Sequence, residues 1–242
     1  MLNSVNDEAK KNNYFANRNV EGEMYAHYNL PKYLYPYFQE QDKDLNILDI
    51  GCGLGQFLSN LKSKGFKNLY GIDINEESIV ACRNNGLSVE KIDDIRTYAL
   101  KSTIKFDRIV MSHVLEHIDK ELIIDTLIHI RKYLLKEGGE FLLMVPNAQS
   151  YTGTYWRYED FTHTIIFTAG SCLYVLKAAG FTNINFIDPE GTIHLSRIKR
   201  IILKQLIAYH KFKEDIWNKI LQTSFHKPSP RIYSFELKVA AS

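Results

Sequence analysis

Short apolar runs alternate with segments of helical periodicity from Leu45 to about Phe186, and this alternation is the feature that most restricts the fold. A short apolar run indicates a buried strand, whereas apolar residues spaced three and four apart indicate one face of a helix. Strands separated by helices form βαβ units around a parallel sheet. The strands are expected at residues 45–50, 68–73, 88–92, 106–111, 141–145 and 183–187. The sequence therefore predicts an α/β fold.

One helix is well marked, over about residues 120–136. Its apolar positions share the spacing of a single helix face and are Ile123, Leu127, Ile130 and Leu134. Gly138 and Gly139 follow as a stop signal. We expect this stripe to be buried in the core and to take no part in a functional site.

The domain organisation follows from length and from where the alternation stops. A chain of 242 residues suits one α/β domain with additions, since single cores keep growing to roughly 250 residues. Residues 1–44 are polar and Tyr-rich and are expected to form an N-terminal helical cap on a domain spanning 45–242. Residues 190–229 read as a helical insertion of one or two amphipathic helices, and residues 231–240 as a last strand.

Composition favours a cytoplasmic protein. Thirty basic and 28 acidic residues give a formal net charge of +2, so the total charge does not call for a nucleic acid or an anionic membrane as partner. The three cysteines lack a metal-binding spacing and are an odd number, which suits a reducing compartment. No apolar run is long enough to span a bilayer, and the N-terminal residues do not resemble a targeting signal.

The densest local signal is the run L-N-I-L-D-I-G-C-G-L-G-Q at 45–56, a strand followed by a glycine turn and a helix. Glycines at 51, 53 and 55 let the backbone approach a ligand, and the helix N-terminus attracts an anion. Asp73, at the end of the next strand, can accept both hydroxyls of a ribose. Gln56 stands where a dinucleotide fingerprint requires glycine. The pattern therefore predicts an adenosine-containing ligand other than a dinucleotide.

Five blocks, in order over about residues 45–187, resemble the class I S-adenosylmethionine-dependent methyltransferases. They are D-I-G-C-G-L-G at 49–55, G-I-D at 71–73, Asp94-Ile95 before a helix, F-D-R-I-V-M-S-H-V-L-E-H-I at 106–118, and L-L-K-E-G-G-E-F-L-L-M-V-P-N at 134–147. The resemblance implies a Rossmann-like, doubly wound sheet of seven strands. Its strands would be mostly parallel, with an antiparallel last strand preceded by the helical insertion.

The resemblance also implies a cofactor site for S-adenosylmethionine. Gly51 and Gly53 would face the methionine part, Asp73 the ribose, and Asp94 the adenine amino group. The remaining members of the expected set are Asp49, Ile74, Ile95, whose amide would meet the adenine ring, and Ser112, beside the methionine end with His113. Asp93 is an alternative to Asp94, and a helix cap is an alternative role for Asp73 or Asp94.

The stretch H-V-L-E-H at 113–117 has two interpretations. It matches the zinc signature of an inverted metalloprotease class, but its place after the fourth strand disfavours a protease. It also resembles the metal-binding stretch of ubiquinone-biosynthesis O-methyltransferases, with His113 in place of an acid. On a helical turn, His113, Glu116 and His117 would share one face and could hold a divalent cation. Alternatively, Glu116 and His117 support the site without a metal.

A second polar cluster follows the fifth strand. Asp160-Phe-Thr-His163 before Phe167-Thr-Ala-Gly-Ser-Cys-Leu resembles the acceptor side of bacterial sugar and small-molecule O-methyltransferases. His163 is thus a candidate general base oriented by Asp160, with His117 as the alternative base. A purely structural loop histidine is the other interpretation of His163. Tyr155, Trp156 and Tyr158 could line a sugar pocket or pack within a lid.

These features predict O-methylation of a small polar or anionic acceptor. A sugar, a nucleotide sugar or a phosphorylated metabolite of surface polysaccharide biosynthesis would suit the basic segment 197–231, which has nine Lys and Arg against two acids. A nitrogen acceptor, a catalytically silent adenosylmethionine-binding scaffold and another nucleotide-dependent enzyme remain alternatives. No nucleic acid is expected, because the segment also carries an apolar stripe, which could instead form a homodimer interface: Ile198, Ile201, Ile202 and Leu206.

Overall fold

The computed structural model describes residues 28–224 and 229–242, which fall into two compact units. Unit 1 comprises the described residues up to Met111 together with Lys132–Phe141. Unit 2 comprises Ser112–Arg131 and Leu142–Ser242. Strands β4 (Phe106–Ser112) and β5 (Leu135–Pro146) begin in unit 1 and end in unit 2.

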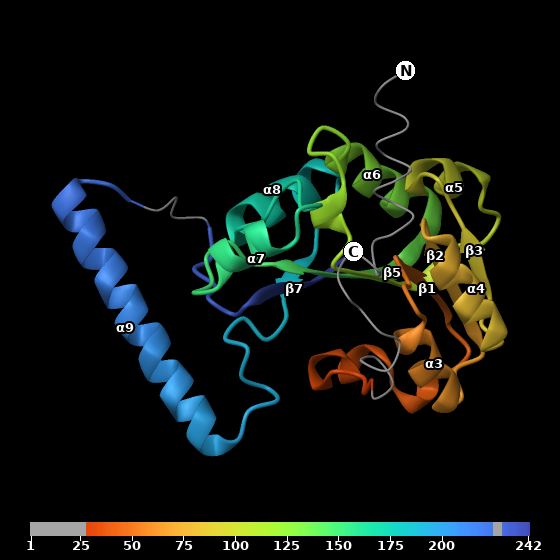
Figure 1. Ribbon diagram of the computed structural model, residues 1–242, viewed down its shortest axis with the longest axis horizontal. Helices are drawn as coiled ribbons and strands as arrows, with labels where there is room; N and C mark the ends of the chain where they lie inside the picture. Colours follow the sequence, from red (N-terminus) through yellow and green to blue (C-terminus); the bar gives the residue numbers. More distant parts are fainter. Residues whose placement is uncertain (1–27, 225–228) are drawn as a thin grey trace. The chain divides into compact units, whose positions relative to one another are not determined.

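Seven strands form one sheet in the order β3-β2-β1-β4-β5-β7-β6 (Figure 1). The strands not yet placed are β1 (Asn46–Ile50), β2 (Asn68–Asp73), β3 (Val89–Lys91), β6 (Ile184–Phe186) and β7 (Glu236–Ala241). Strands β1, β2, β3 and β4 pair in parallel, whereas β6 and β7 are antiparallel. The predicted fold class, a mostly parallel Rossmann-like sheet with an antiparallel last strand, is confirmed.

The buried strands explain why the apolar runs could be read from the sequence. Four consecutive residues of β1, from Ile47 to Ile50, are buried, as expected of a parallel strand covered on both faces. In the register, Ile50 is paired with Ile72 of β2 and with Met111 of β4. The carboxyl ends of these three strands therefore lie side by side, which is where open α/β sheets bind ligands.

The helices of unit 1 begin at identifiable signals. Helix α3 (Gln56–Ser63) follows Gly55, which has a left-handed backbone. Helix α4 (Glu76–Asn84) is capped by Asn75, whose side chain accepts the Ser78 amide at 2.9 Å. Helix α5 (Ile95–Lys101) is capped by Asp94.

The N-terminal cap expected over residues 1–44 lies partly outside the described residues. Between residues 28 and 44 the structure contains two short 3-10 helices, η2 (Lys32–Tyr37) and η3 (Glu40–Asp42). Phe38 is buried, and its ring packs edge-on against Phe57 of α3 at 5.5 Å between centroids. This segment is thus anchored to unit 1 by aromatic packing.

The helix expected at 120–136 is shorter than predicted. Helix α6 (Ile123–His129) continues as a π-helical turn, Ile130–Leu134, and the chain then enters β5 at Leu135, before the expected stop at Gly138. The four stripe residues have at most 1% exposure, so the prediction that they belong to the core is confirmed. Residues 135 and 136, which the spacing of apolar residues assigned to the helix, thus belong to β5.

Unit 2 holds α7 (Gly153–Glu159), α8 (Ala169–Ala178), β6 and β7. Helix α8 has a reciprocal capping box, in which Thr168 accepts the Ser171 amide and the Ser171 hydroxyl accepts the Thr168 amide. Every residue of β7 is buried, including Glu236 and Lys238. Two buried charged side chains on a single strand require partners of opposite charge. Glu236 pairs with His113, and Lys238 pairs with Asp188.

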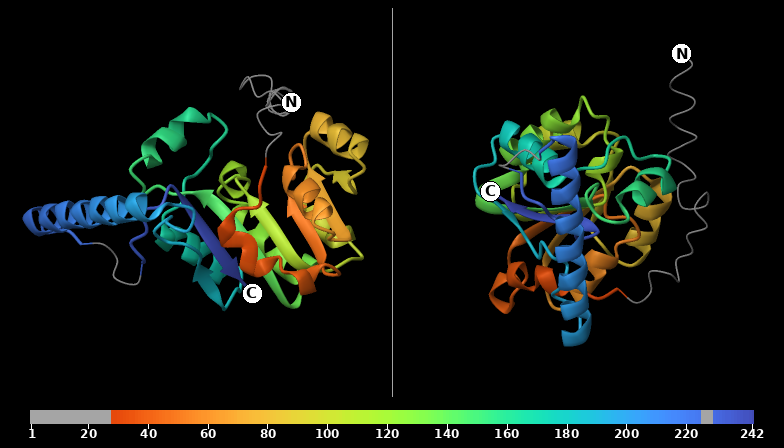
Figure 2. Two further views of the ribbon diagram at one scale, coloured as in Figure 1. Left: turned by 90° about the horizontal axis from the view of Figure 1, so that it is seen from below. Right: turned by 90° about the vertical axis from the view of Figure 1, so that its left-hand side faces the viewer.

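The insertion contains one uninterrupted helix, α9 (Arg197–Leu221), as Figure 2 shows. Ser196 caps its start, and Gln222, in a left-handed conformation, ends it. Arg231 ties the helix to unit 2 through Asp215 at 2.8 Å and Glu214 at 3.1 Å. None of the helices in the part of the chain that the structure describes combines the length and apolar character needed to cross a lipid bilayer.

Asn147, which follows β5, should be important for the stability of unit 2. Its buried amide donates to the carbonyls of Ile232 and Ser234, each at 2.8 Å. We predict that Asn147→Ala lowers the unfolding free energy by about 2 to 4 kcal/mol, because two buried carbonyls lose their donor. Urea denaturation measures this, with the exposed Asn183→Ala as the control expected within about 0.5 kcal/mol of wild type. Equal effects of both substitutions would contradict the assignment.

Candidate functional site

The glycine turn after β1 presents open backbone. Gly51, Gly53 and Gly55 all have positive φ, and the amides of Gly51 and Cys52 both donate to the Ile72 carbonyl. A Cβ placed on Gly53 would meet no atom within 4 Å, whereas one on Gly55 would clash with Cys82 Sγ at 2.7 Å. The turn is therefore closed at Gly55 by packing and open to a ligand at Gly53.

Asp73 connects the end of β2 to this turn. Its two carboxylate oxygens accept the amides of Gly53 and Asn75, each at 2.8 Å. Burial raises the pKa of Asp73, and these backbone donors act in the opposite direction. Asp49 is 5% exposed, and its burial, followed by the nearby Asp73 charge, raises the pKa of Asp49 to about 7. The buried Asp49 and the half-buried Asp73 together favour a ligand that carries positive charge.

Asp94 has the helix-cap geometry that the sequence left as an alternative. Its carboxylate accepts the amides of Arg96 and Thr97 at 2.8 and 3.0 Å. It also pairs with the Arg96 guanidinium at 2.7 Å, which lowers the pKa of Asp94. Asp93, the alternative, is exposed. An adenine contact from Asp94 or from the Ile95 amide stays a prediction.

The chain leaves β4 through a backbone conformation that is uncommon outside glycine. Ser112 is half-buried, and His113 has a φ of 54°, with its amide donating to the Met144 carbonyl at 2.9 Å. The 3-10 helix η4 (Leu115–His117) follows directly. This turn places Glu116 and His117 on η4 and leaves His113 before it, outside the helical turn.

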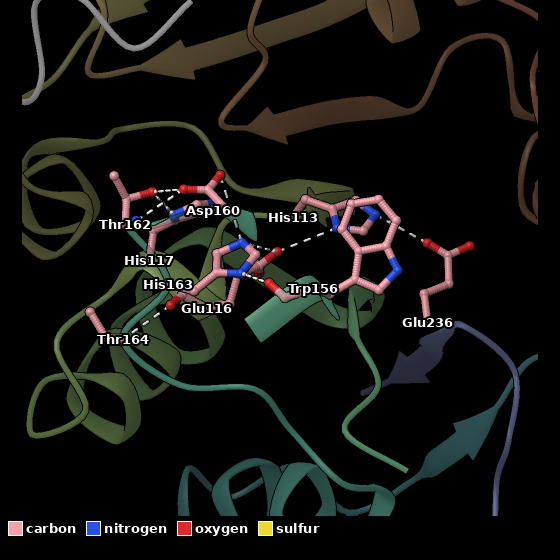
Figure 3. A network of polar contacts seen from close by, with 9 residues as sticks. All are labelled: His113, Glu116, His117, Trp156, Asp160, Thr162, His163, Thr164 and Glu236. Atoms are coloured by element: carbon pink, nitrogen blue, oxygen red, sulfur yellow. Dashed lines mark hydrogen bonds and ion pairs between the residues drawn. The ribbon is translucent and has the colours of Figure 1, made fainter. Parts of the chain in front are cut away.

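Glu116 is the centre of a cluster of ionisable side chains in unit 2 (Figure 3). Its side chain is fully buried, and neither carboxylate oxygen has a hydrogen bond among the residues that the structure describes. His113 Nδ1 lies 3.3 Å and His163 Nε2 lies 4.0 Å from Glu116 Oε1. Burying a carboxylate without hydrogen bonds is unfavourable unless a positive charge lies nearby.

His113 supplies that charge. Its Nε2 atom lies 3.1 Å from Glu236 Oε2, so the ring bridges two buried carboxylates (Figure 3). Desolvation lowers the pKa of His113, but Glu116 and Glu236 outweigh it and raise the pKa to about 10. His113 is therefore an imidazolium at neutral pH, and a protonated ring cannot serve as a metal ligand or as a base.

The tautomer of His117 follows from its neighbours. The Thr162 hydroxyl donates to Asp160 Oδ1 at 2.6 Å, and its oxygen lies 2.8 Å from His117 Nδ1. Because a hydroxyl has one proton, His117 Nδ1 must donate to Thr162, which leaves the lone pair on His117 Nε2. Desolvation, followed in this direction by the nearby His163, lowers the pKa of His117, so its ring is neutral at pH 7.

His163 is fixed in the same tautomer by a different partner. Its Nδ1 atom lies 2.7 Å from the Trp156 carbonyl oxygen, which can only accept, so Nδ1 donates and the neutral tautomer is the one with its lone pair on Nε2. The His163 side chain is only 6% exposed, and its ring centroid lies 4.7 Å from that of His117. His163 Nε2 and Asp160 Oδ2 are 3.9 Å apart, beyond a hydrogen bond. The sequence predicted that Asp160 orients His163. In the structure Asp160 instead contacts His117 through the Thr162 hydroxyl.

The three potential metal ligands that the structure brings together differ from the expected three. Ligand atoms of Glu116, His117 and His163 all lie within 4.8 Å of one another. His113, which was expected in this set, instead bridges Glu116 and Glu236 through its two ring nitrogens. Two histidines and one carboxylate are a common ligand set for divalent transition metals.

Sequence reasoning missed Thr162, Glu236 and Lys238 as members of this site. Lys238 Nζ lies 3.6 Å from Glu236 Oε1 and 3.5 Å from Asp188 Oδ2, so charges of alternating sign continue along β7. The signal was available, since Glu236 and Lys238 are two charged residues at alternate positions of a strand that is otherwise apolar. The exposed Tyr155 and Tyr158 of α7 leave the pocket and lid alternatives open.

Comparisons with known proteins point to one family. A family model described as a methyltransferase domain matches residues 23–185, more than half of the chain. A tRNA U34 carboxymethyltransferase of Vibrio cholerae is 27% identical over 164 residues, which cover 62% of this chain and 49% of the relative. A ubiquinone biosynthesis O-methyltransferase of Rickettsia bellii is 34% identical over 83 residues, 31% of this chain and 32% of the relative.

Solved structures agree on the fold. A methyltransferase from Archaeoglobus fulgidus, described as dependent on S-adenosylmethionine, superposes with a TM-score of 0.59 at 23% identity, over 85% of this chain and 88% of the other. The plantazolicin methyltransferase BpumL, solved with S-adenosylhomocysteine, gives 0.53 at 18% identity over 87% and 81% of the two chains. The chain spans about half the length of the tRNA-modifying relative.

The charge on His113 predicts a specific pH dependence of stability. A histidine whose pKa is raised on folding contributes stability fully below about 6.5, its value in the unfolded chain, and loses it as pH rises to about 10. The wild-type protein should therefore be more stable than His113→Gln at pH 6, and this difference should shrink steadily between pH 6.5 and 10. Denaturation across pH measures it, with exposed His194→Gln as the control. A difference that grows with pH would contradict the assignment.

Proposed function

Because the chain belongs to the class I S-adenosylmethionine-dependent methyltransferase family, we propose that it transfers the methyl group of S-adenosylmethionine to a hydroxyl of a small polar acceptor. The observation that carries the proposal is the neutral His117, held in one tautomer beside a buried carboxylate. A neutral imidazole with a defined lone pair suits the removal of a hydroxyl proton. We infer an oxygen acceptor from this chemistry.

The cofactor would bind at the carboxyl ends of β1 and β2. Its anionic carboxylate would meet the open backbone of the glycine turn at Gly53, and its ribose hydroxyls would donate to Asp73. Asp49 would face the cationic methionine end, whose positive charge would keep the carboxylate ionised. Ile74, which is 45% exposed directly after Asp73, offers an apolar surface to the adenosine. Ser112, Asp94 and Ile95 complete the proposed set.

Methyl transfer requires the acceptor oxygen in line with the bond between sulfur and methyl carbon, so positioning supplies much of the rate. His117 Nε2 would take the hydroxyl proton as the new bond to carbon forms and S-adenosylhomocysteine leaves. Asp160, acting through the Thr162 hydroxyl, would stabilise the resulting imidazolium, as a triad carboxylate does. His163 is the second candidate, but its burial leaves less room for an acceptor.

The same side chains could also bind a divalent metal ion, because Glu116, His117 and His163 fit the ligand set of one. His117 Nε2 and His163 Nε2 both carry lone pairs, and their other ring nitrogens donate to Thr162 and to the Trp156 carbonyl, as metal-bound histidines usually do. Glu116 would be the third ligand and would gain the partners that its oxygens lack. A bound ion would lower the pKa of an acceptor hydroxyl. The expected ligand His113 would then serve as the counter-ion of Glu116.

The class of acceptor is proposed from the sequence. Sugars, nucleotide sugars and phosphorylated metabolites stay predictions from the sequence, as does a nitrogen acceptor. One curated relative is named for tRNA and another for ubiquinone biosynthesis, and each name describes that relative. A silent adenosylmethionine-binding protein would share the Asp73 site but would not need a fixed His117 tautomer. The His117 contacts therefore favour an enzyme.

The cofactor assignment predicts a binding defect in Asp73→Asn. Replacing the charged acceptor of two ribose hydroxyls should weaken S-adenosylhomocysteine binding by roughly 1.5 to 3 kcal/mol, or about 10- to 150-fold in Kd. Isothermal titration calorimetry measures this, and the exposed Asp44→Asn is the matched control, expected to bind like wild type. Unchanged affinity in Asp73→Asn would remove Asp73 from the proposed site.

The base assignment predicts that substitutions at His117 and Thr162 lower kcat to different extents. An acceptor for this assay would first be identified by screening hydroxylated compounds for labelled methyl transfer. His117→Ala should lower kcat by about 10²- to 10⁴-fold and leave cofactor affinity nearly unchanged. Thr162→Val should lower kcat less and shift the acid limb of its pH profile to lower pH, since the imidazolium loses its support. Thr162→Ser, which keeps the hydroxyl, should restore both. Activity that survives in His117→Ala but not in His163→Ala would overturn the assignment, and activity lost on chelation would favour the metal alternative.

A further inference from the structure

Helix α9 exposes a long apolar face. Its apolar face consists of nine side chains that are each 41–72% exposed: Ile198, Ile201, Ile202, Leu206, Tyr209, Phe212, Ile216, Trp217 and Ile220. No residue of this 25-residue helix is buried. Large contiguous apolar patches are rare on monomeric proteins and usually mark an interface.

The apolar face points away from the rest of unit 2. The less exposed positions of α9 recur on another side of the helix and are Leu203, Ile207, His210, Lys211, Glu214 and Asn218. Arg231 and Tyr233 contact this second side, through Glu214 and the Lys211 carbonyl. At 100° per residue the two sides lie roughly opposite each other. The described residues of unit 2 thus contact this second side of α9 and leave the apolar face uncovered.

The apolar face is symmetric about Tyr209. Ile198 and Ile220 lie eleven residues to either side of it, and Ile202 and Ile216 lie seven residues to either side. Leu206 and Phe212 lie three residues away, and Ile201 and Trp217 eight residues away. All nine members of the face are accounted for by this symmetry. A self-complementary patch is what an isologous two-fold interface requires.

We propose that α9 packs antiparallel against α9 of a second copy of this chain, with the two-fold axis passing beside Tyr209. Ile198 then meets Ile220 of the partner subunit, and Ile202 meets Ile216 of the partner subunit. The pairing is independent of the proposed methyl transfer, because no residue of α9 belongs to that site.

Lys213, the lysine nearest the middle of the apolar face, fits the same arrangement. Gln205 and Lys213 lie four residues to either side of Tyr209, so the Lys213 ammonium meets the amide oxygen of Gln205 of the partner subunit. Lys199 and Lys219, ten residues to either side, face each other only at the exposed edge of the interface, where solvent screens their charges. A parallel pair would instead set Lys213 beside its own copy. The position of Lys213 therefore favours the antiparallel orientation.

The area of the face is large enough for a stable dimer. Aromatic side chains bury roughly 150–250 Å² when fully covered, and aliphatic ones roughly 60–120 Å². With the exposures above, the nine side chains offer on the order of 500–900 Å² per subunit, a range that includes the roughly 800 Å² that each partner buries in a standard interface. Lys213, near the middle of the face, would lie against acyl chains if the helix inserted into a bilayer, so a second copy fits better than a lipid surface.

Cysteine cross-linking with a short bis-maleimide tests this pairing in the full chain. The native cysteines, Cys52, Cys82 and Cys172, are buried and should contribute little background. Tyr209→Cys should cross-link to itself in high yield. Ile198→Cys and Ile220→Cys should each cross-link poorly alone but efficiently when the two variants are mixed. Sedimentation should give about twice the 28.1 kDa chain mass, and Phe212→Glu should halve it while the exposed Ile193→Glu control does not.

Three results would overturn the proposal. A monomer at micromolar concentration would remove the dimer, and equal self-cross-linking at 198, 209 and 220 would indicate a parallel pair. Binding of a monomer to phosphatidylglycerol vesicles, lost in Phe212→Glu, would assign the face to a membrane surface. The circular dichroism of Phe212→Glu should match wild type, because residue 212 is 61% exposed, and this separates loss of pairing from misfolding.

Discussion

The burial of Glu116 is the constraint on which the site in unit 2 depends. A carboxyl group with no exposed surface and no hydrogen bond among the described residues needs a nearby positive charge if it is to be ionised. His113 meets this requirement as an imidazolium. On β7, Glu236 pairs with His113 and Lys238 pairs with Glu236. With His113 placed as the counter-ion, His117 and His163 are further neighbours of the same carboxyl group. Burial lowers the pKa of His117, so His117 has the neutral ring that a base requires.

Much of the fold could be predicted from the sequence, because its signals are local. A buried parallel strand shows as an unbroken apolar run, as at Ile47–Ile50, and a glycine turn shows as glycines that the backbone requires, as at Gly55. The cofactor candidates follow from the same topology, since strand ends such as Asp73 lie at one edge of the sheet. The boundary between α6 and β5 was misplaced, because strand pairing overrides helical periodicity there.

The acceptor-side site was predicted only in part, because its arrangement depends on contacts between distant residues. His113, Glu116 and His117 look equivalent in the sequence, and only the positive φ of His113 turns it toward Glu236, 123 residues away. Thr162 connects Asp160 to His117 across 45 residues, so the expected pairing of Asp160 with His163 was replaced by a relay. The tautomer of His163 depends on a backbone carbonyl, which no side-chain pattern can indicate.

A crystal structure with S-adenosylhomocysteine tests the central claim most directly, because it places the reacting sulfur relative to the cluster around Glu116. We expect the ribose hydroxyls on Asp73 and the sulfur directed toward His117, with space between them for an acceptor hydroxyl. A sulfur directed away from His117, or an adenosine bound elsewhere than at Asp73, would contradict the account.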